Sequence, residues 1–513
     1  MKDITRRRLQ KRKRKIERRL ARRGKRQTQR TKRNATVMSA ENFKYEVSDK
    51  SRGLVYGGIG LMRRLAERTG LVGAIDDRLQ LLKIHLPYHE SDHVLNFAFN
   101  ALCEGTCLED IELRRNDECF LDAVGAETIP DPTTAGDFCR RFSQPVVRAL
   151  LDAIDAARRN VWKEQPESFF DEAVIDMDGT LVVTGGECKE GMDISYKGTW
   201  GYHPLIVSLA NTGELLSLVN RSGNRPSEEG AAAEADRAAA LCRRAGFRRI
   251  VFRGDTAFSQ SEQLDGWNEA GDILFYFGYP AMGNLVERAN SLPETAWTKL
   301  ARPPQYDVKT VPRRKPAKVK RQVIRAREFL HLELVSEEVA EFVYSPTACK
   351  NSYRLIVVKK NISREKGENV LFDEVRYFFY ITNDRKKTPA EVVFSCNDRC
   401  DQENLIAQLS GGVRSLAAPV DSLVSNWAYM VMTSLAWTLK AWAALLLPVS
   451  GRWQEKHQAE RRTLLRMEFK TFVNAFMKIP CQIVHQSRRT IFRVLGWNPQ
   501  LPVFFRLCHV LRI

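Results

Sequence analysis

The sequence predicts an α/β fold in which a strand-rich core lies between two helical regions. Apolar residues recur at intervals of three and four through residues 39–165 and again after residue 398, as in amphipathic helices. From residue 170 short β-rich runs alternate with turns and helices, which is typical of an α/β sheet. A chain of 513 residues is too long for one compact unit, so we expect several domains.

The chain opens with a strongly basic segment. Residues 1–33 hold 18 Lys and Arg, a large part of the net charge of +19. Such a run repels itself and has little to bury, so we expect residues 1–38 to be a disordered basic tail. Leu9, Ile16 and Leu20 would share one stripe of a helix, so the tail could fold against a polyanion. A solubilising tail is the alternative.

Residues 39–165 are predicted to form a helical N-terminal domain. The first part of the core, residues 166–282, then alternates strands and helices. Its predicted strands are Ala173–Val183, His203–Leu209, Glu214–Asn220, Arg249–Arg253 and Ile273–Gly278. One helix begins at Ser227 and ends before Gly246, and a second spans Ser261–Ala270.

Residues 283–375 are predicted to be a β-rich insertion, because strand-like runs replace helices there. Eight Lys and Arg within residues 311–327 give it a cationic arm. The core resumes over residues 376–447 with a strand at Tyr377–Thr382 and a helix that opens near Asp398. Residues 448–513 are predicted to be a helical C-terminal region.

Two features exclude other classes of protein. The apolar segment Leu423–Leu447 is long enough for a bilayer, but Lys440 and several hydroxyl side chains favour a buried core helix. The chain shows no secretory signal, and its 11 Cys are scattered without the paired spacing of a zinc module. We therefore expect an intracellular protein with reduced thiols and no membrane partner.

Acidic side chains stand at the ends of two predicted strands. Asp176 and Asp178 share one face of the first strand, because side chains two apart on a strand point the same way. Asp255 ends the strand that begins at Arg249. Carboxylates on neighbouring strand ends can bind a divalent cation. A structural alternative is that these are turn-forming Asp residues, which are common before Gly.

The run Asp176-Met177-Asp178-Gly179-Thr180-Leu181 resembles the nucleophile loop of haloacid-dehalogenase-type phosphatases. That resemblance implies phosphorylation of Asp176, with Asp178 as the general acid. The later metal motif of that family is only half present, since no second acid follows Gly254-Asp255 within the next five residues.

A third acid, Glu403, gives a second resemblance. Asp178, Asp255 and Glu403, with a β-rich insertion between the last two, resemble the DDE transposases of bacterial insertion sequences. The closer match is the cut-and-paste branch with a Tyr-x2-Arg-x3-Glu-x6-Lys signature. Arg399 and Glu403 match it, whereas Cys396 replaces the Tyr and Ser410 the Lys. Further phrases that read like a family member are Asp131–Phe138, Asp401–Ile406 and Asn426–Tyr429.

This resemblance implies a ribonuclease-H-like mixed-sheet core that cleaves and transfers DNA strands. Asp178, Asp255 and Glu403 would be the catalytic residues and hold two Mg²⁺ ions, for which Mn²⁺ can substitute, and Asp176 is a second candidate for the first ligand. Arg399 would bind a DNA phosphate. The predicted DNA contacts of the arm are Arg313, Arg314, Lys315, Lys318 and Arg321.

The expected partners follow from the same resemblance. The helical domain over residues 39–165 would bind the terminal inverted repeats of the element, and the chain would act as a homodimer on element and target DNA. It would work in the cytoplasm, at the nucleoid. A DNA-binding protein without catalytic activity remains a further alternative.

Overall fold

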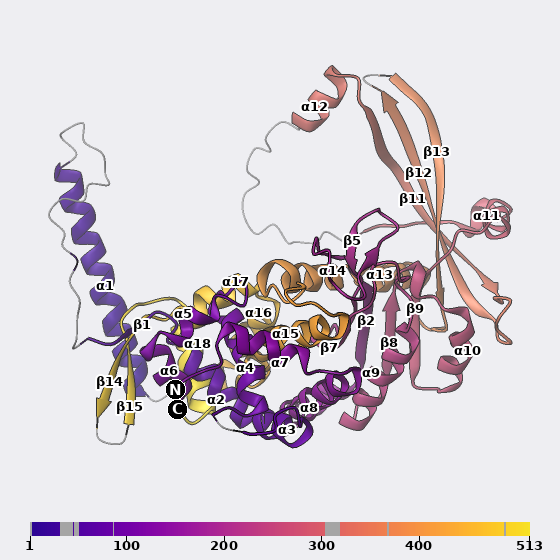
Figure 1. The fold of residues 1–513 in the computed structure, drawn as a ribbon. Coiled ribbons are helices and arrows are strands. Elements are labelled where there is room, and N and C mark those ends of the chain that lie inside the picture. Colours follow the sequence, from indigo (N-terminus) through magenta and orange to yellow (C-terminus); the bar gives the residue numbers. More distant parts are fainter. Residues whose placement is uncertain are drawn as a thin grey trace.

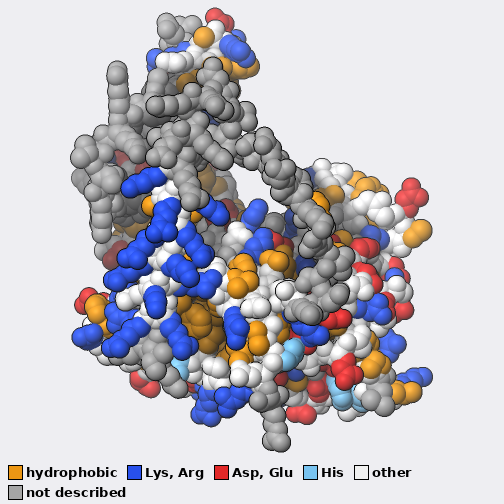
Figure 2. All heavy atoms as spheres, turned by 90° about the vertical axis from the view of Figure 1, so that its left-hand side faces the viewer, with side chains coloured by type: hydrophobic (Ala, Val, Ile, Leu, Met, Phe, Trp, Pro, Cys, Tyr) orange, Lys and Arg blue, Asp and Glu red, His pale blue; other side chains and the backbone are white. Residues whose placement is uncertain are grey.

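The computed structural model describes residues 3–30, 45, 51–85, 87–302, 319–366, 369–486 and 489–513. Helix α1, Asp3–Arg30, occupies most of the segment expected to be disordered. Leu9 is only 8% exposed, Lys13 lies over the ring of Trp497 and Arg12 donates to the carbonyl of Leu495. Leu9 therefore finds a surface in the C-terminal region, which the sequence alone did not show, whereas Leu20 of the predicted stripe is 59% exposed. Basic side chains gather along α1 (Figure 2).

Helices follow through residue 162, which confirms the helical character of this region among the described residues. Asp131 illustrates how one begins: its side chain accepts hydrogen bonds from the amide and hydroxyl of Thr134, and Pro132 occupies the first turn. The helices are α2 Ile59–Arg68, α3 Leu71–Arg78, α4 Glu90–Leu102, α5 Ile111–Arg115, α6 Glu118–Val124, α7 Pro132–Arg140 and α8 Gln144–Trp162.

The core is a nine-stranded mixed sheet with the order β10-β11-β12-β13-β9-β8-β2-β6-β7. β2 pairs in parallel with β8 and antiparallel with β6, and β8 pairs in parallel with β9. The central strands are β2 Ala173–Gly179, β6 Leu205–Leu209, β7 Glu214–Val219, β8 Ile250–Gly254 and β9 Ile273–Tyr279. Four of the five predicted strands are present with ends shifted by at most two residues, but the predicted strand Ala173–Val183 is divided: β2 ends at Gly179, and Val182–Val183 form β3 of another sheet. A small separate sheet contains β3 Val182–Val183, β4 Asp193–Ile194 and β5 Trp200–Tyr202.

The connecting helices are α9, Ala231–Ala245, and α10, Ser261–Glu269. α9 begins four residues after the predicted Ser227, because Gly230 adopts a left-handed conformation with φ of 74° just before it. Gly246, with φ of 107°, ends α9 where the sequence predicted a C-terminal glycine.

The β-rich insertion continues the core sheet. β13 pairs with β9 through its last residues, Phe379 opposite Tyr279 and Thr382 opposite Tyr276. The far ends of its long strands project away from the molecule (Figure 1). Its elements are α11 Gly283–Asn290, β10 Thr298–Lys299, α12 Val319–Ala326, β11 Leu330–Tyr344, β12 Tyr353–Lys366 and β13 Asn369–Thr382. The boundary predicted at residue 375 falls inside β13, because the predicted strand Tyr377–Thr382 is the second half of this longer strand.

The chain then returns to helices, α13 Pro389–Asn397, α14 Cys400–Ala407, a π-helical turn Gln408–Gly412 and α15 Leu423–Leu445. α15 is almost wholly buried in the protein, which confirms the core-helix prediction. Within the described ranges no helix has the length and apolarity that crossing a membrane requires.

The C-terminal region differs from the helical prediction in one place. α16 Gln454–Arg466, α17 Phe469–Phe472 and α18 Leu501–Val510 are helical, but a hairpin lies between α17 and α18. It consists of β14, Cys481–Gln486, and β15, Arg489–Val494, and β14 pairs with β1, Gly53–Leu54. β1 precedes β14 by more than 400 residues in the sequence, so no local pattern predicts that the two strands pair.

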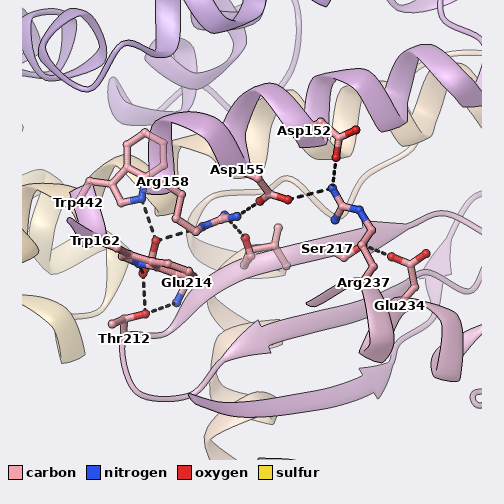
Figure 3. A network of polar contacts seen from close by, with 11 residues as sticks. Asp152, Asp155, Arg158, Trp162, Thr212, Glu214, Ser217, Glu234, Arg237 and Trp442 are labelled. Atoms are coloured by element: carbon pink, nitrogen blue, oxygen red, sulfur yellow. Dashed lines mark hydrogen bonds and ion pairs between the residues drawn. The ribbon is translucent and has the colours of Figure 1, made fainter. Parts of the chain in front are cut away.

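A buried polar network ties the helical domain to the core (Figure 3). Glu214 on β7 is fully buried and accepts hydrogen bonds from Trp162 of α8 at 2.9 Å, Trp442 of α15 at 2.8 Å and Thr212 at 2.8 Å. Arg158 of α8 forms an ion pair with Glu214 at 3.2 Å. Buried carboxylates are retained only when they are paired in this way, so the network holds α8, β7 and α15 in register.

Candidate active site

The structure places Asp178 and Asp255 at the C-terminal ends of two neighbouring central strands, β2 and β8. β2 and β8 run in parallel with Asp176 opposite Arg253. Asp178 lies two residues after Asp176 within β2, and Asp255 lies two residues after Arg253, directly beyond the end of β8. The Asp178 carboxylate accepts a hydrogen bond from the amide of Gly179 at 2.8 Å. Asp255 accepts one from the amide of Ala257 at 2.9 Å. Both acids are partly exposed.

Glu403 approaches these acids from α14, which packs against β2. The pKa of Asp178 is raised to about 6: burial is the largest cause, the negative charges of Asp255 and, more weakly, Glu403 add to it, and Arg399 opposes them. Electrostatic repulsion of this kind acts only between groups that are close together. Asp255 and Glu403, far apart from Asp178 in the sequence, therefore both lie within electrostatic range of it.

Asp176 is in a different environment from Asp178 although both lie on β2. Its side chain is 1% exposed, and both of its oxygens accept hydrogen bonds from the Arg253 guanidinium, at 2.6 and 2.7 Å. Burial lowers the pKa of Arg253, but the bonds to Asp176 outweigh burial and the net shift is upward. The oxygens of Asp176 are thus engaged in a bidentate ion pair inside the protein.

The other three acids have no such partner. Among the residues that the structure describes, no Lys or Arg forms an ion pair with Asp178, Asp255 or Glu403, and the hydrogen bonds to both Asp side chains come from backbone amides. Glu403 is exposed on the surface of α14. In the same described part of the chain, no group of three or more His, Cys, Asp or Glu side chains is arranged to hold a metal ion as it stands.

The remaining predicted residues are distributed as follows. Arg399 is partly buried at the N-terminal end of α14, one turn before Glu403. Cys396 is buried on α13 in a small apolar cluster, and Ser410 lies exposed in the π-helical turn after α14. Arg321 belongs to α12. The other predicted arm residues lie outside the described residues: Arg313, Arg314, Lys315 and Lys318.

Two residues that the sequence analysis did not single out lie at this site. Arg253 pairs with Asp176, and Gln402 is buried beside Glu403 with its side chain directed at β6. Arg253 carried a recognisable signal, since an Arg inside an otherwise apolar strand implies a buried acidic partner. Gln402 carried none, because its contacts depend on how α14 packs.

Comparisons with known proteins identify the family of the chain. The transposase DDE domain group 1 family matches residues 54–512. No curated protein matches the chain. One similar solved structure is a piggyBac transposase in a synaptic complex with hairpin DNA, at 10% identity and a TM-score of 0.35, covering 82% of this chain and 81% of that one. The family match spans almost the whole chain and leaves no support for the phosphatase alternative. The chain belongs to the DDE transposase family of group 1 and is a DNA transposase.

Proposed function

We propose that this chain is the transposase of a bacterial insertion sequence and that Asp178, Asp255 and Glu403 are its catalytic triad. The observation that carries the proposal is the placement of the acids: Asp178 and Asp255 lie at the same end of two neighbouring parallel strands, and α14, which carries Glu403, packs against β2. Carboxylates that repel one another and form no ion pair with a Lys or Arg among the described residues are costly to a folded protein, even though Arg399 offsets part of the repulsion at Asp178. Such an arrangement is typical of a site that binds a cation.

The architecture supports a ribonuclease-H-like core. Strands β7, β6 and β2 are antiparallel neighbours, and β8 and β9 continue the same sheet in parallel with β2. Two acids follow the central parallel strands, and the third comes from a helix beyond the β-rich insertion. This is the arrangement that the transposase resemblance implies.

The three acids fit divalent metal ions by their chemistry. They offer carboxylate oxygens without Lys or Arg partners in the described structure, and hard ions such as Mg²⁺, or Mn²⁺ in its place, prefer these ligands. Two bound ions would activate the attacking hydroxyl and stabilise the leaving oxygen of a phosphodiester. Asp176 is not needed as a ligand in this scheme, since Arg253 already occupies both of its oxygens.

The chain's own side chains would orient the DNA. Arg399 lies within electrostatic range of Asp178, where its planar guanidinium could hold a phosphate oxygen by two hydrogen bonds. The basic face of α1 and the arm around residues 313–321 would attract the DNA backbone without reading its sequence. Recognition of the terminal inverted repeats would fall to the N-terminal helices. A homodimer in the bacterial cytoplasm would bring the two element ends together with target DNA.

Alanine substitution tests this proposal. Asp178→Ala, Asp255→Ala and Glu403→Ala should each abolish Mg²⁺-dependent cleavage of DNA that carries the element ends, while binding of the same DNA is retained. If the wild-type protein binds these ends but cleaves them with neither Mg²⁺ nor Mn²⁺, the chain is a DNA-binding protein without this activity. If Glu403→Ala cleaves normally, the third ligand is another residue.

A further inference from the structure

We propose that Gln402, together with the ion pair between Arg253 and Asp176, positions Glu403 against the strand ends that carry Asp178 and Asp255. This inference rests on the proposed function. It assigns to these residues a role in holding the site together, without contact with the substrate.

Gln402 connects α14 to the strand beside the first acid. Its side chain is 2% exposed, its amide donates to the carbonyl of Ile206 at 3.1 Å, and its oxygen accepts a hydrogen bond from the Ser208 hydroxyl. Ile206 and Ser208 are the β6 residues directly opposite Asp178 and Asp176. Gln402, the residue next to Glu403, is therefore bonded to the two β6 residues that pair with Asp178 and Asp176 in the sheet.

The ion pair performs the same task between the two parallel strands. Arg253 and Asp176 are paired in the β2–β8 register and each lies two residues before a proposed metal ligand. The same guanidinium donates to the carbonyl of Ser395 on α13 at 3.4 Å. One buried side chain thus contacts β2 and the helix that precedes α14, while its own strand carries Asp255.

Glu403 requires such support. α14 has only eight residues, and an isolated helix of this length is unstable in water. Glu403 itself is exposed, and the charge of Asp178 repels it when no cation is bound. Without an anchor, α14 would relieve this repulsion by moving away from the strand ends. A buried amide that makes two hydrogen bonds opposes that movement.

The test compares two identical substitutions on the same helical segment. Gln402→Met keeps the length of the side chain and removes both hydrogen bonds. Gln408→Met is the matched control, because the Gln408 side chain accepts a hydrogen bond from the amide of Phe469 at 2.9 Å, at the far end of the segment from the acids. Ser208→Ala removes only the hydroxyl donor to Gln402 and serves if Gln402→Met does not fold.

Three measurements on the full chain distinguish positioning from general stability. Mn²⁺ binding is measured by calorimetry, cleavage is measured as a function of Mn²⁺ concentration, and hydrogen exchange reports opening of α14 without metal. Loss of groups that orient metal ligands costs about 10- to 100-fold in metal affinity or activity. We expect Gln402→Met to weaken Mn²⁺ binding in this range and to accelerate exchange in residues 400–407, with DNA binding unchanged. Gln408→Met should bind Mn²⁺ like the wild type.

The outcomes separate this inference from the proposed function. Equal Mn²⁺ affinity for Gln402→Met and Gln408→Met, with wild-type exchange in α14, would overturn the positioning role. If Asp178→Ala binds Mn²⁺ as tightly as the wild type does, the proposed metal site is contradicted instead. Ser208→Ala should change Mn²⁺ binding in the same direction as Gln402→Met, and an unchanged affinity would also count against the inference.

Discussion

Substitution by Asn should raise the free energy of unfolding at Asp178 and lower it at Asp176. The pKa of Asp178 is raised from 3.8 to about 6 in the folded protein. Each pKa unit corresponds to about 1.4 kcal/mol, so the ionised carboxylate costs the folded state about 3 kcal/mol at neutral pH. The folded state does not bear this cost below pH 3.8, where Asp178 is protonated in both the folded and the unfolded chain. The free energy of unfolding falls as the pH rises from 3.8 through about 6. Asp178→Asn removes the cost.

We therefore expect metal-free Asp178→Asn to be more stable than the wild type by about 2–3 kcal/mol at pH 7.5, with little difference at pH 4. Asp176→Asn removes one half of a buried bidentate pair and leaves Arg253 without its partner, which should cost about 3–5 kcal/mol. Urea unfolding in EDTA at the two pH values measures both effects. The reasoning is refuted if Asp178→Asn is no more stable than the wild type at pH 7.5, or if both substitutions shift stability in the same direction.

Three other features of the structure give testable expectations. Glu214→Leu removes one of the two carboxylate partners of Arg158 and the acceptor of three buried hydrogen-bond donors, and should lower the free energy of unfolding in urea by about 3–5 kcal/mol; a loss below about 1 kcal/mol would contradict the network. Burial lowers the pKa of Lys440 from 10.5 to about 7 in the folded protein. Between pH 7 and 10.5 the unfolded chain therefore binds a proton that the folded chain has lost, and the free energy of unfolding of the wild type should rise with pH. Lys440→Met should lack that rise, and parallel pH profiles of the two proteins would argue against it. Deleting residues 1–30 should make DNA binding less dependent on salt, and an unchanged slope would assign α1 a role in solubility alone.

The order of strands and helices could be predicted from the sequence because it depends on local patterns. Short apolar runs ended by acids predicted β2 and β8 with Asp178 and Asp255 at their ends. Alternation along a strand could not separate Asp176 from Asp178, since both project from the same face. The difference comes from Arg253, which stands opposite Asp176 only through the β2–β8 register.

Other features depended on contacts between distant segments. α1 has the charge of a disordered tail, yet Leu9 packs against the C-terminal region and the helix docks there. The β14–β15 hairpin pairs with β1 near the start of the chain. Gln402 reads as an ordinary helix residue until α14 is placed on the sheet. In each case tertiary packing overrides or supplies what local propensity lacks.

Replacing each proposed ligand by cysteine tests the central claim most directly. A thiolate binds Mg²⁺ poorly and softer ions such as Mn²⁺ better. Asp178→Cys, Asp255→Cys and Glu403→Cys should each lose cleavage of element-end DNA in Mg²⁺ and regain part of it in Mn²⁺. Glu403→Cys that cleaves in Mg²⁺ as the wild type does, or that Mn²⁺ fails to rescue while it rescues Asp178→Cys, would contradict a site built from these three acids.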